Sequence, residues 1–160
     1  KVVQDLSGDA IVDLWSGYVR TLATGPLTLL HGDAHIGNTY VLPDGDVGFL
    51  DWQVLRRGNW SQDVGYFLVS ALTEEDRRNH ETALLQVYRG ALEVPQHQLP
   101  TMEQVWLQYR STPAYGLAIW LSTLGTDGWQ SREISLALAQ RFAAAFVELD
   151  TLSALHHMAE

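Results

Sequence analysis

The sequence contains no cysteine, which excludes disulfide bonds, thiolate metal sites and a cysteine nucleophile. Lysine is almost absent as well, because Lys1 is the only one and the other basic residues are arginines. The body of the chain therefore has neither a P-loop lysine nor a Schiff-base lysine. Any ammonium group that contacts phosphate must come from outside residues 2–160.

Basic residues are also few in total, with ten Lys and Arg against nineteen Asp and Glu and a net charge of −9. A chain this acidic is a poor partner for a phosphate backbone or an anionic membrane surface. No apolar run approaches the ~20 residues that a membrane span needs, and no signal peptide is recognisable. We therefore expect no nucleic-acid partner, no membrane partner and a cytoplasmic location. The length of 160 residues predicts a single domain over residues 1–160.

Hydrophobic periodicity predicts an α+β domain that consists mainly of helices. A buried strand is expected at 27–30, followed by a polar loop at 31–38 and a β-hairpin around the turn at 43–46. A second loop is expected at 56–60. Local patterns predict three helix starts: Ser61 as a cap, Thr73 with Asp76, and Thr101 with Gln104. The expected helices span 7–23, 61–72, 73–92, 101–124 with a break or restart at Pro113, and 131–158 without a break.

The loop at 31–38 and the hairpin after it carry the chemistry. The loop sequence is HGDAHIGN, and Asp51 follows at the end of the second hairpin strand, on the face of Val47 and Phe49. Because the hairpin folds back, Asp51 returns close to Asn38. Amide and carboxylate oxygens are the ligands that Mg²⁺ takes together with water and substrate phosphates. Asp33 is left free to accept a hydroxyl proton, which completes the groups needed for phosphoryl transfer.

This stretch resembles a known group of enzymes. HGDxxxxN, followed by a hydrophobic strand that ends in aspartate, is similar to the aminoglycoside phosphotransferase and choline kinase-like superfamily, which has the protein kinase-like fold. The sequences LDWQ at 50–53 and DVGYFL at 63–68 look closest to those of the ecdysteroid kinase-like branch. The resemblance covers roughly residues 29–72.

The resemblance implies an activity and a role for each matching residue. The enzyme would transfer the γ-phosphoryl group of ATP, or of GTP, to a hydroxyl of a small-molecule acceptor. Asp33 would be the catalytic base, and Asn38 and Asp51 would hold Mg²⁺. His31 would fix the shape of the loop, and Asp63 would support the loop by hydrogen bonding to its backbone.

The sequence also departs from this family pattern. The N-terminal lobe, with its five-stranded sheet, phosphate-covering loop and ATP-contacting lysine, is missing, so the chain looks like the C-terminal lobe alone. The usual Asp-Pro before the supporting aspartate is replaced by Asn59-Trp60. A lobe without its partner exposes an apolar face. We therefore expect self-association near residues 27–30 and the hairpin, and little ATP turnover by this chain alone.

Two other functions fit the same residues. His31, Asp33 and His35 could be the metal triad of a hydrolase that uses zinc or manganese. A non-catalytic, pseudokinase-like domain is the other alternative, because half of a cleft holds ATP poorly. The aromatic residues of the helical half form either the core or an acceptor pocket, in which they could cage a cation or stack on a flat molecule. These aromatic residues are Trp106, Tyr109, Tyr115, Trp120 and Trp129.

Overall fold

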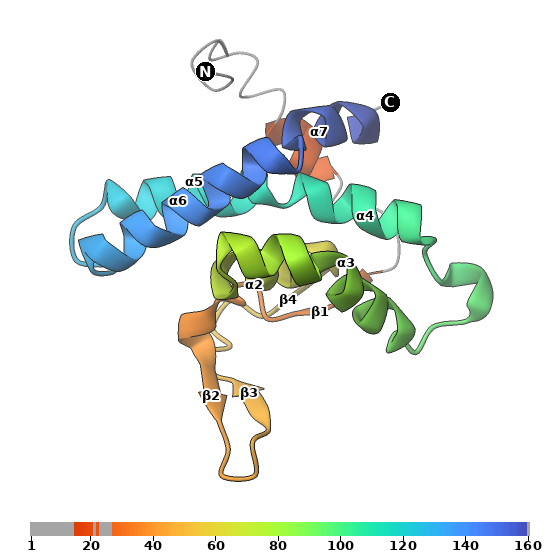
Figure 1. Cartoon of the computed structure of the whole chain (residues 1–160), viewed down its shortest axis with the longest axis horizontal. Coiled ribbons are helices and arrows are strands. Elements are labelled where there is room, and N and C mark those ends of the chain that lie inside the picture. The colour runs from red at the N-terminus through yellow and green to blue at the C-terminus, as the bar shows by residue number, and fades with distance from the viewer. Residues whose placement is uncertain (1–14, 21, 23–26, 160) are drawn as a thin grey trace.

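Helices make up most of the chain in the computed structural model, which describes residues 15–20, 22 and 27–159. Residues 15–20 are helical, whereas the rest of the helix expected at 7–23 lies largely outside the described residues. The later helices are α2 (Ser61–Ala71), α3 (Glu74–Gly90), α4 (Met102–Ser111), α5 (Pro113–Leu124), α6 (Arg132–Glu148) and α7 (Thr151–Ala159). Figure 1 shows α5 and α6 side by side, with α2 next to them. The predicted α+β class is confirmed.

The strands form two small antiparallel sheets. β2 (Thr39–Val41) pairs with β3 (Val47–Phe49) and makes the predicted hairpin, which projects away from the helices in Figure 1. The strand predicted at 27–30 is β1 (Leu27–Leu30), but the expectation that it is buried was wrong, because Leu30 is the only buried residue of β1. β1 pairs with β4 (Arg56–Asn59). The expectation of a loop at 56–60 was therefore wrong. A segment as polar as RRGN carries no strand pattern, and only its pairing with β1 makes it a strand.

Helix boundaries follow local capping where a side chain can reach the first turn. The Thr73 hydroxyl accepts from the Asp76 amide, and Thr101 with Gln104 forms a complete capping box, as predicted. The prediction for Ser61 was wrong, because Ser61 lies inside α2 and its amide donates to Asn59 Oδ1 instead.

The long helix expected over 131–158 is divided in two. α6 ends at Glu148, and Asp150 has a left-handed φ of 48° before α7 begins at Thr151. The Arg110 side chain on α4 donates to the carbonyl of Leu149 at 2.6 Å. An interaction with a distant helix therefore satisfies a carbonyl at this break, which explains why the local sequence, without glycine or proline, did not predict it.

Close helix crossings build the core around α2, α4, α5 and α6. A Cβ atom on Gly65 of α2 would lie 2.1 Å from the Thr112 hydroxyl, and one on Gly116 of α5 would lie 2.0 Å from the Phe142 ring on α6. Glycine at both positions lets the helices approach each other. The largest fully buried apolar side chains of this core are Tyr66, Val69, Leu85, Val105, Tyr109 and Phe142.

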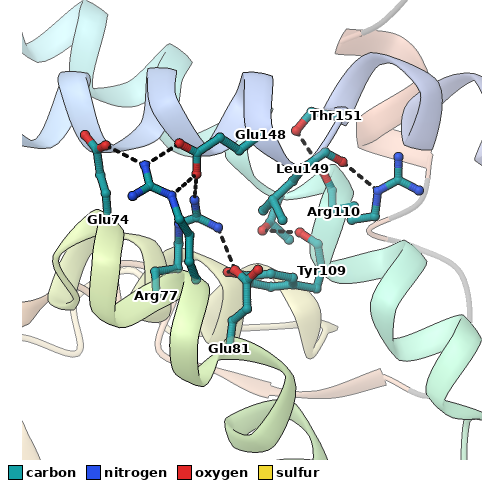
Figure 2. A network of polar contacts seen from close by, with 10 residues as sticks. Glu74, Arg77, Glu81, Tyr109, Arg110, Glu148, Leu149 and Thr151 are labelled. Carbon is teal, nitrogen blue, oxygen red and sulfur yellow. Dashed lines mark hydrogen bonds and ion pairs between the residues drawn. The ribbon is translucent and has the colours of Figure 1, made fainter.

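A network of charged side chains connects α3 with α4 and α6 (Figure 2). Arg77 is only 2% exposed and donates to Glu81 at 2.6 Å and to Glu148. The Tyr109 hydroxyl donates to the same Glu81 carboxylate at 2.8 Å, and Arg78 binds Glu148 from the solvent side, 3.0 Å from Nε to Oε2. The charge of the buried arginine is thus paired with two carboxylates, which offsets the penalty of burying it.

Candidate active site

The loop between β1 and β2 is anchored by one carboxylate at the start of α2. Asp63 Oδ2 accepts from the His31 amide at 2.6 Å, and Asp63 Oδ1 accepts from the Gly32 amide at 3.1 Å. Burial raises the pKa of Asp63, and the two amides and the charge of Arg56 oppose that shift. Gly32 has a left-handed φ of 88°, and a Cβ there would lie 2.4 Å from the carbonyl oxygen of Val54. This turn therefore requires glycine.

The ring of His31 ties the loop to the segment after the hairpin. Its Nε2 lies 2.8 Å from the carbonyl oxygen of Leu50, and its Nδ1 accepts from the Asp33 amide at 3.3 Å. A carbonyl oxygen only accepts, so the proton of the neutral ring lies on Nε2. His31 is 4% exposed, and its ring packs against Phe49 and Trp52. Both ring nitrogens are used to hold the loop.

Asp33, Asn38 and Asp51 come together as expected, although the path of the chain differs. Asn38 Nδ2 donates to the Asp33 carbonyl at 3.0 Å and lies 3.4 Å from Asp33 Oδ2. The Leu50 amide donates to the Asn38 carbonyl at 3.0 Å, which brings Asp51 beside Asn38. The predicted strand position of Asp51 was wrong, because β3 ends at Phe49 and Asp51 has a left-handed φ of 61°. Asp51 therefore leaves the Val47 and Phe49 face.

His35 lies close to Asp33 at the other side of the loop. Its Nδ1 accepts from the Gly37 amide at 3.0 Å, so its Nε2 carries the proton and lies 3.7 Å from Asp33 Oδ2. Burial lowers the pKa of His35, although the Asp33 charge opposes this shift. The ring is therefore predominantly neutral near pH 7, and the Asp33 carboxylate has no cationic histidine beside it.

A cavity of about 690 Å³ opens beside the loop, between α2 and α5. Its polar lining includes Asp33, His35 and Arg56. Of the five aromatic residues singled out in the helical half, Tyr115, Trp120 and Trp129 line this cavity, whereas Tyr109 is a fully buried core residue and Trp106 lines a different cavity near α7. Trp120 belongs to the buried core and also lines the cavity, so core and pocket are not exclusive alternatives for these residues.

Tyr66 also lines the cavity, and sequence reasoning assigned it no role. It lies three residues after Asp63 on α2, and residues with this spacing share one face of a helix. Since Asp63 anchors the loop, helical spacing alone would have placed Tyr66 near the loop. Arg56 had no comparable signal, because it reaches the cavity through the unexpected pairing of β4 with β1.

The donor set fits a magnesium ion better than the metal triad of a hydrolase. Asn38 Nδ2 is committed to Asp33, which leaves its Oδ1 available, and the Asp51 carboxylate is contacted at 3.5 Å by Gln53 Nε2. Two such oxygens suit a hard cation that also binds water and phosphates. His31 has no free nitrogen for a metal, and the described residues contain no cluster of three His, Cys, Asp or Glu side chains that could hold one.

Comparison with known protein families shows which family the chain belongs to. The family model that matches is that of the ecdysteroid kinase-like family, over residues 5–99, more than half of the chain. The chain belongs to the ecdysteroid kinase-like family. It is thereby a member of a group of kinase-like phosphotransferases, which in general use ATP and Mg²⁺. The match includes the anchored loop, the hairpin and α2, whereas the cavity wall formed by α5 lies outside the matched residues.

No curated protein and no solved structure matches this ecdysteroid kinase-like chain. Among the residues that the structure describes, no helix combines the length and the apolar character needed to cross a membrane.

Proposed function

We propose that this chain is the catalytic-loop and acceptor-binding lobe of an enzyme that transfers the γ-phosphoryl group of ATP, or of GTP, to a hydroxyl group of a small molecule. The observation that carries the proposal is the anchored loop, in which Asp33 lines the cavity, Asn38 is bound to Asp33, and the backbone next to Asp51 is bound to Asn38. The anchored backbone of the loop places these residues together before substrate binds, and positioning and electrostatics are the main contributions to the catalysis of phosphoryl transfer.

Each residue has a separate role in this proposal. Asp33 orients the acceptor hydroxyl and accepts its proton. Asn38 and Asp51 hold the magnesium ion, which neutralises the nucleotide phosphates when it is bound. Asp63 and His31 keep the loop in its conformation through the backbone amides and the Leu50 carbonyl.

The acceptor proposed for the cavity is neutral and flat rather than cationic. The charged side chains that line the cavity are those of Asp33 and Arg56, which have opposite signs, and the rest of the lining is largely aromatic or aliphatic. The net charge of −9 is therefore not concentrated in this cavity. Aromatic walls favour an apolar ring system, and the absence of a carboxylate cage among the lining residues disfavours a polyamine.

The nucleotide-covering lobe is proposed to lie outside residues 1–160. The chain has no lysine after Lys1 to contact the nucleotide phosphates. In addition, several apolar side chains on β1, the hairpin and the following segment are exposed: Leu29, Tyr40, Val41, Val47, Leu50 and Trp52. Exposed apolar surface of this kind is typical of an interface. We propose that the second lobe covers it in the intact enzyme.

Kinetics of the intact enzyme test the roles of the two aspartates. Asp33→Asn should lower the rate about 10²–10⁴-fold, the usual loss of a general base, and leave the magnesium requirement unchanged. Asp51→Asn should raise the magnesium requirement, because a hard cation prefers an anionic oxygen. Asp44→Asn on the hairpin turn is the matched control and should change neither. A wild-type rate and magnesium dependence in Asp51→Asn would refute the assignment.

Calorimetry with Mg-ATP tests the missing lobe. The chain of residues 1–160 should bind Mg-ATP weakly and turn it over negligibly, because nothing in it covers the phosphates. Binding tighter than about 1 μM would contradict the proposal and show that this chain forms a complete nucleotide site.

Sedimentation tests the exposed surface. The chain alone should self-associate at high concentration, and Val41→Lys on the hairpin should reduce the association. Val87→Lys on α3 is the matched control, because Val41 and Val87 are both 71% exposed. Equal effects of the two substitutions would show that no particular surface is involved.

A further inference from the structure

Two buried polar groups beneath the loop, the Tyr66 hydroxyl and Trp120 Nε1, lack a well-formed hydrogen bond in the described part of the chain. Tyr66 is 2% exposed and Trp120 is 4% exposed. The Tyr66 hydroxyl and Trp120 Nε1 are both shielded from solvent, and neither makes a hydrogen bond of normal geometry. A buried donor without a partner carries a desolvation penalty, so native proteins rarely keep one without a reason.

Both groups lie beside the proposed base. Tyr66, Trp120 and Asp33 line the same cavity. The His35 ring, which is 3.7 Å from Asp33, meets both aromatic rings edge-on, with centroid distances of 6.3 Å to Tyr66 and 5.6 Å to Trp120. Burial raises the pKa of Tyr66, and the negative charge of Asp33 raises it further. This agrees with the proximity of the Tyr66 hydroxyl to the Asp33 carboxylate.

The Asp33 carboxylate, in turn, is held only weakly. Its side chain is 40% exposed, and its Oδ2 has a long contact of 3.4 Å with Asn38 Nδ2. His35 Nε2 at 3.7 Å is beyond hydrogen-bonding distance. A catalytic base must be held in a defined orientation to meet the acceptor hydroxyl. The structure thus combines a weakly held carboxylate with a neighbouring buried donor that makes no hydrogen bond of normal geometry.

We infer that Tyr66 is a positioning residue for Asp33, with its hydroxyl donating to the Asp33 carboxylate and Trp120 Nε1 donating to the Tyr66 oxygen. This inference rests on the proposed function, in which Asp33 is the base. The tyrosine oxygen accepts one hydrogen bond and donates another, so both buried groups become satisfied when the carboxylate turns toward α2. The hydroxyl keeps its proton throughout, and the acceptor proton goes to Asp33 alone.

A double-mutant cycle on residues 1–160 tests the contact without any activity. The variants are Tyr66→Phe, Asp33→Ala and the double variant, compared by urea unfolding. If the contact exists, the effects of the two changes on the unfolding equilibrium constant depart from additivity by about tenfold, as expected for a hydrogen bond to a charged group. Tyr109→Phe is the control, because its hydroxyl donates to Glu81 on α3. Its cycle with Asp33→Ala should be additive.

Kinetics of the intact enzyme then separate positioning from folding. Tyr66→Phe should lower kcat about tenfold to a hundredfold and leave the KM for Mg-ATP unchanged. In the Asp33→Ala background it should have no further effect, because the residue acts only through Asp33. Additive effects on stability, or an unchanged kcat in Tyr66→Phe, would overturn the inference. If Asp33→Ala itself retains full activity, the proposed function fails instead.

Discussion

The loop region at 27–59 and the helical region at 61–159 are stabilised in different ways. The loop region has short strands and many exposed apolar side chains, and its conformation depends on a few hydrogen bonds, such as those that Asp63 accepts from loop amides and the one between the His31 ring and the Leu50 carbonyl. The helical region packs large aromatic and aliphatic side chains around glycine crossings and a buried arginine. The loop is therefore held by the packed region, because Asp63, which accepts from the loop amides, lies in the first turn of α2.

Removing the buried arginine should have the largest effect in the helical region. Arg77→Ala leaves Glu81 buried without its cation and should lower the free energy of unfolding by about 3–5 kcal/mol. Arg78→Ala is the control, because Arg78 is 48% exposed and its ion pairs are screened by solvent, so it should cost much less than Arg77→Ala. Urea unfolding of both variants measures the difference. Equal losses would mean that burial does not distinguish the two arginines.

Filling a glycine crossing should have the next largest effect. Gly116→Ala places a Cβ 2.0 Å from the Phe142 ring, and the crowding of α5 against α6 should cost about 1–3 kcal/mol. Gly90→Ala, at the end of α3, meets nothing within 4 Å and should be neutral or stabilising by up to about 0.5 kcal/mol. Thermal unfolding compares the two. A neutral Gly116→Ala would show that the crossing is loose.

Removing the loop anchor should affect the loop region more than the whole chain. Asp63→Ala leaves the amides of His31 and Gly32 without their acceptor and should cost about 1–3 kcal/mol. In Asp63→Ala, hydrogen exchange at these two amides should accelerate much more than exchange at the amides of the α6 core. If exchange accelerates equally in both regions, the anchor stabilises the whole fold and does not act on the loop alone.

The smallest expected effect is a pH dependence within the helical network. Hydrogen bonds from Arg78, then the charges of both arginines, hold the pKa of Glu148 below its ordinary value near 4.5. A lowered carboxyl pKa contributes stability that is fully present above the unfolded pKa and is lost as the pH falls through the folded pKa. The stability difference between wild type and Glu148→Gln should therefore be constant above about pH 4.5 and shrink below it. Urea unfolding across this pH range measures it.

Local patterns predicted a large part of the fold and of the candidate site. The capping residues Thr73 and Thr101, the start of α5 at Pro113 and the hairpin turn depend on residues within three or four positions of one another, so the sequence shows them directly. The pairing of β4 with β1 and the break at Asp150 depend on partners far along the chain, and both were missed. The hairpin brought Asp51 near Asn38 as expected, but its left-handed backbone was not predictable from strand alternation.

The sequence by itself determined which chemical groups are available: three candidate oxygen-bearing residues in and after one loop, and no lysine beyond Lys1. It also determined the family, because HGDxxxxN and the residues that follow it form a continuous pattern. The family resemblance implied that Asp63 and His31 support the loop, but only the tertiary structure decided which amides and which carbonyl they bind. The bond from the His31 amide to Asp63 spans 32 positions, and His31 reaches the Leu50 carbonyl across 19. Contacts over such separations form only when packed helices bring the segments together, and no local pattern records them.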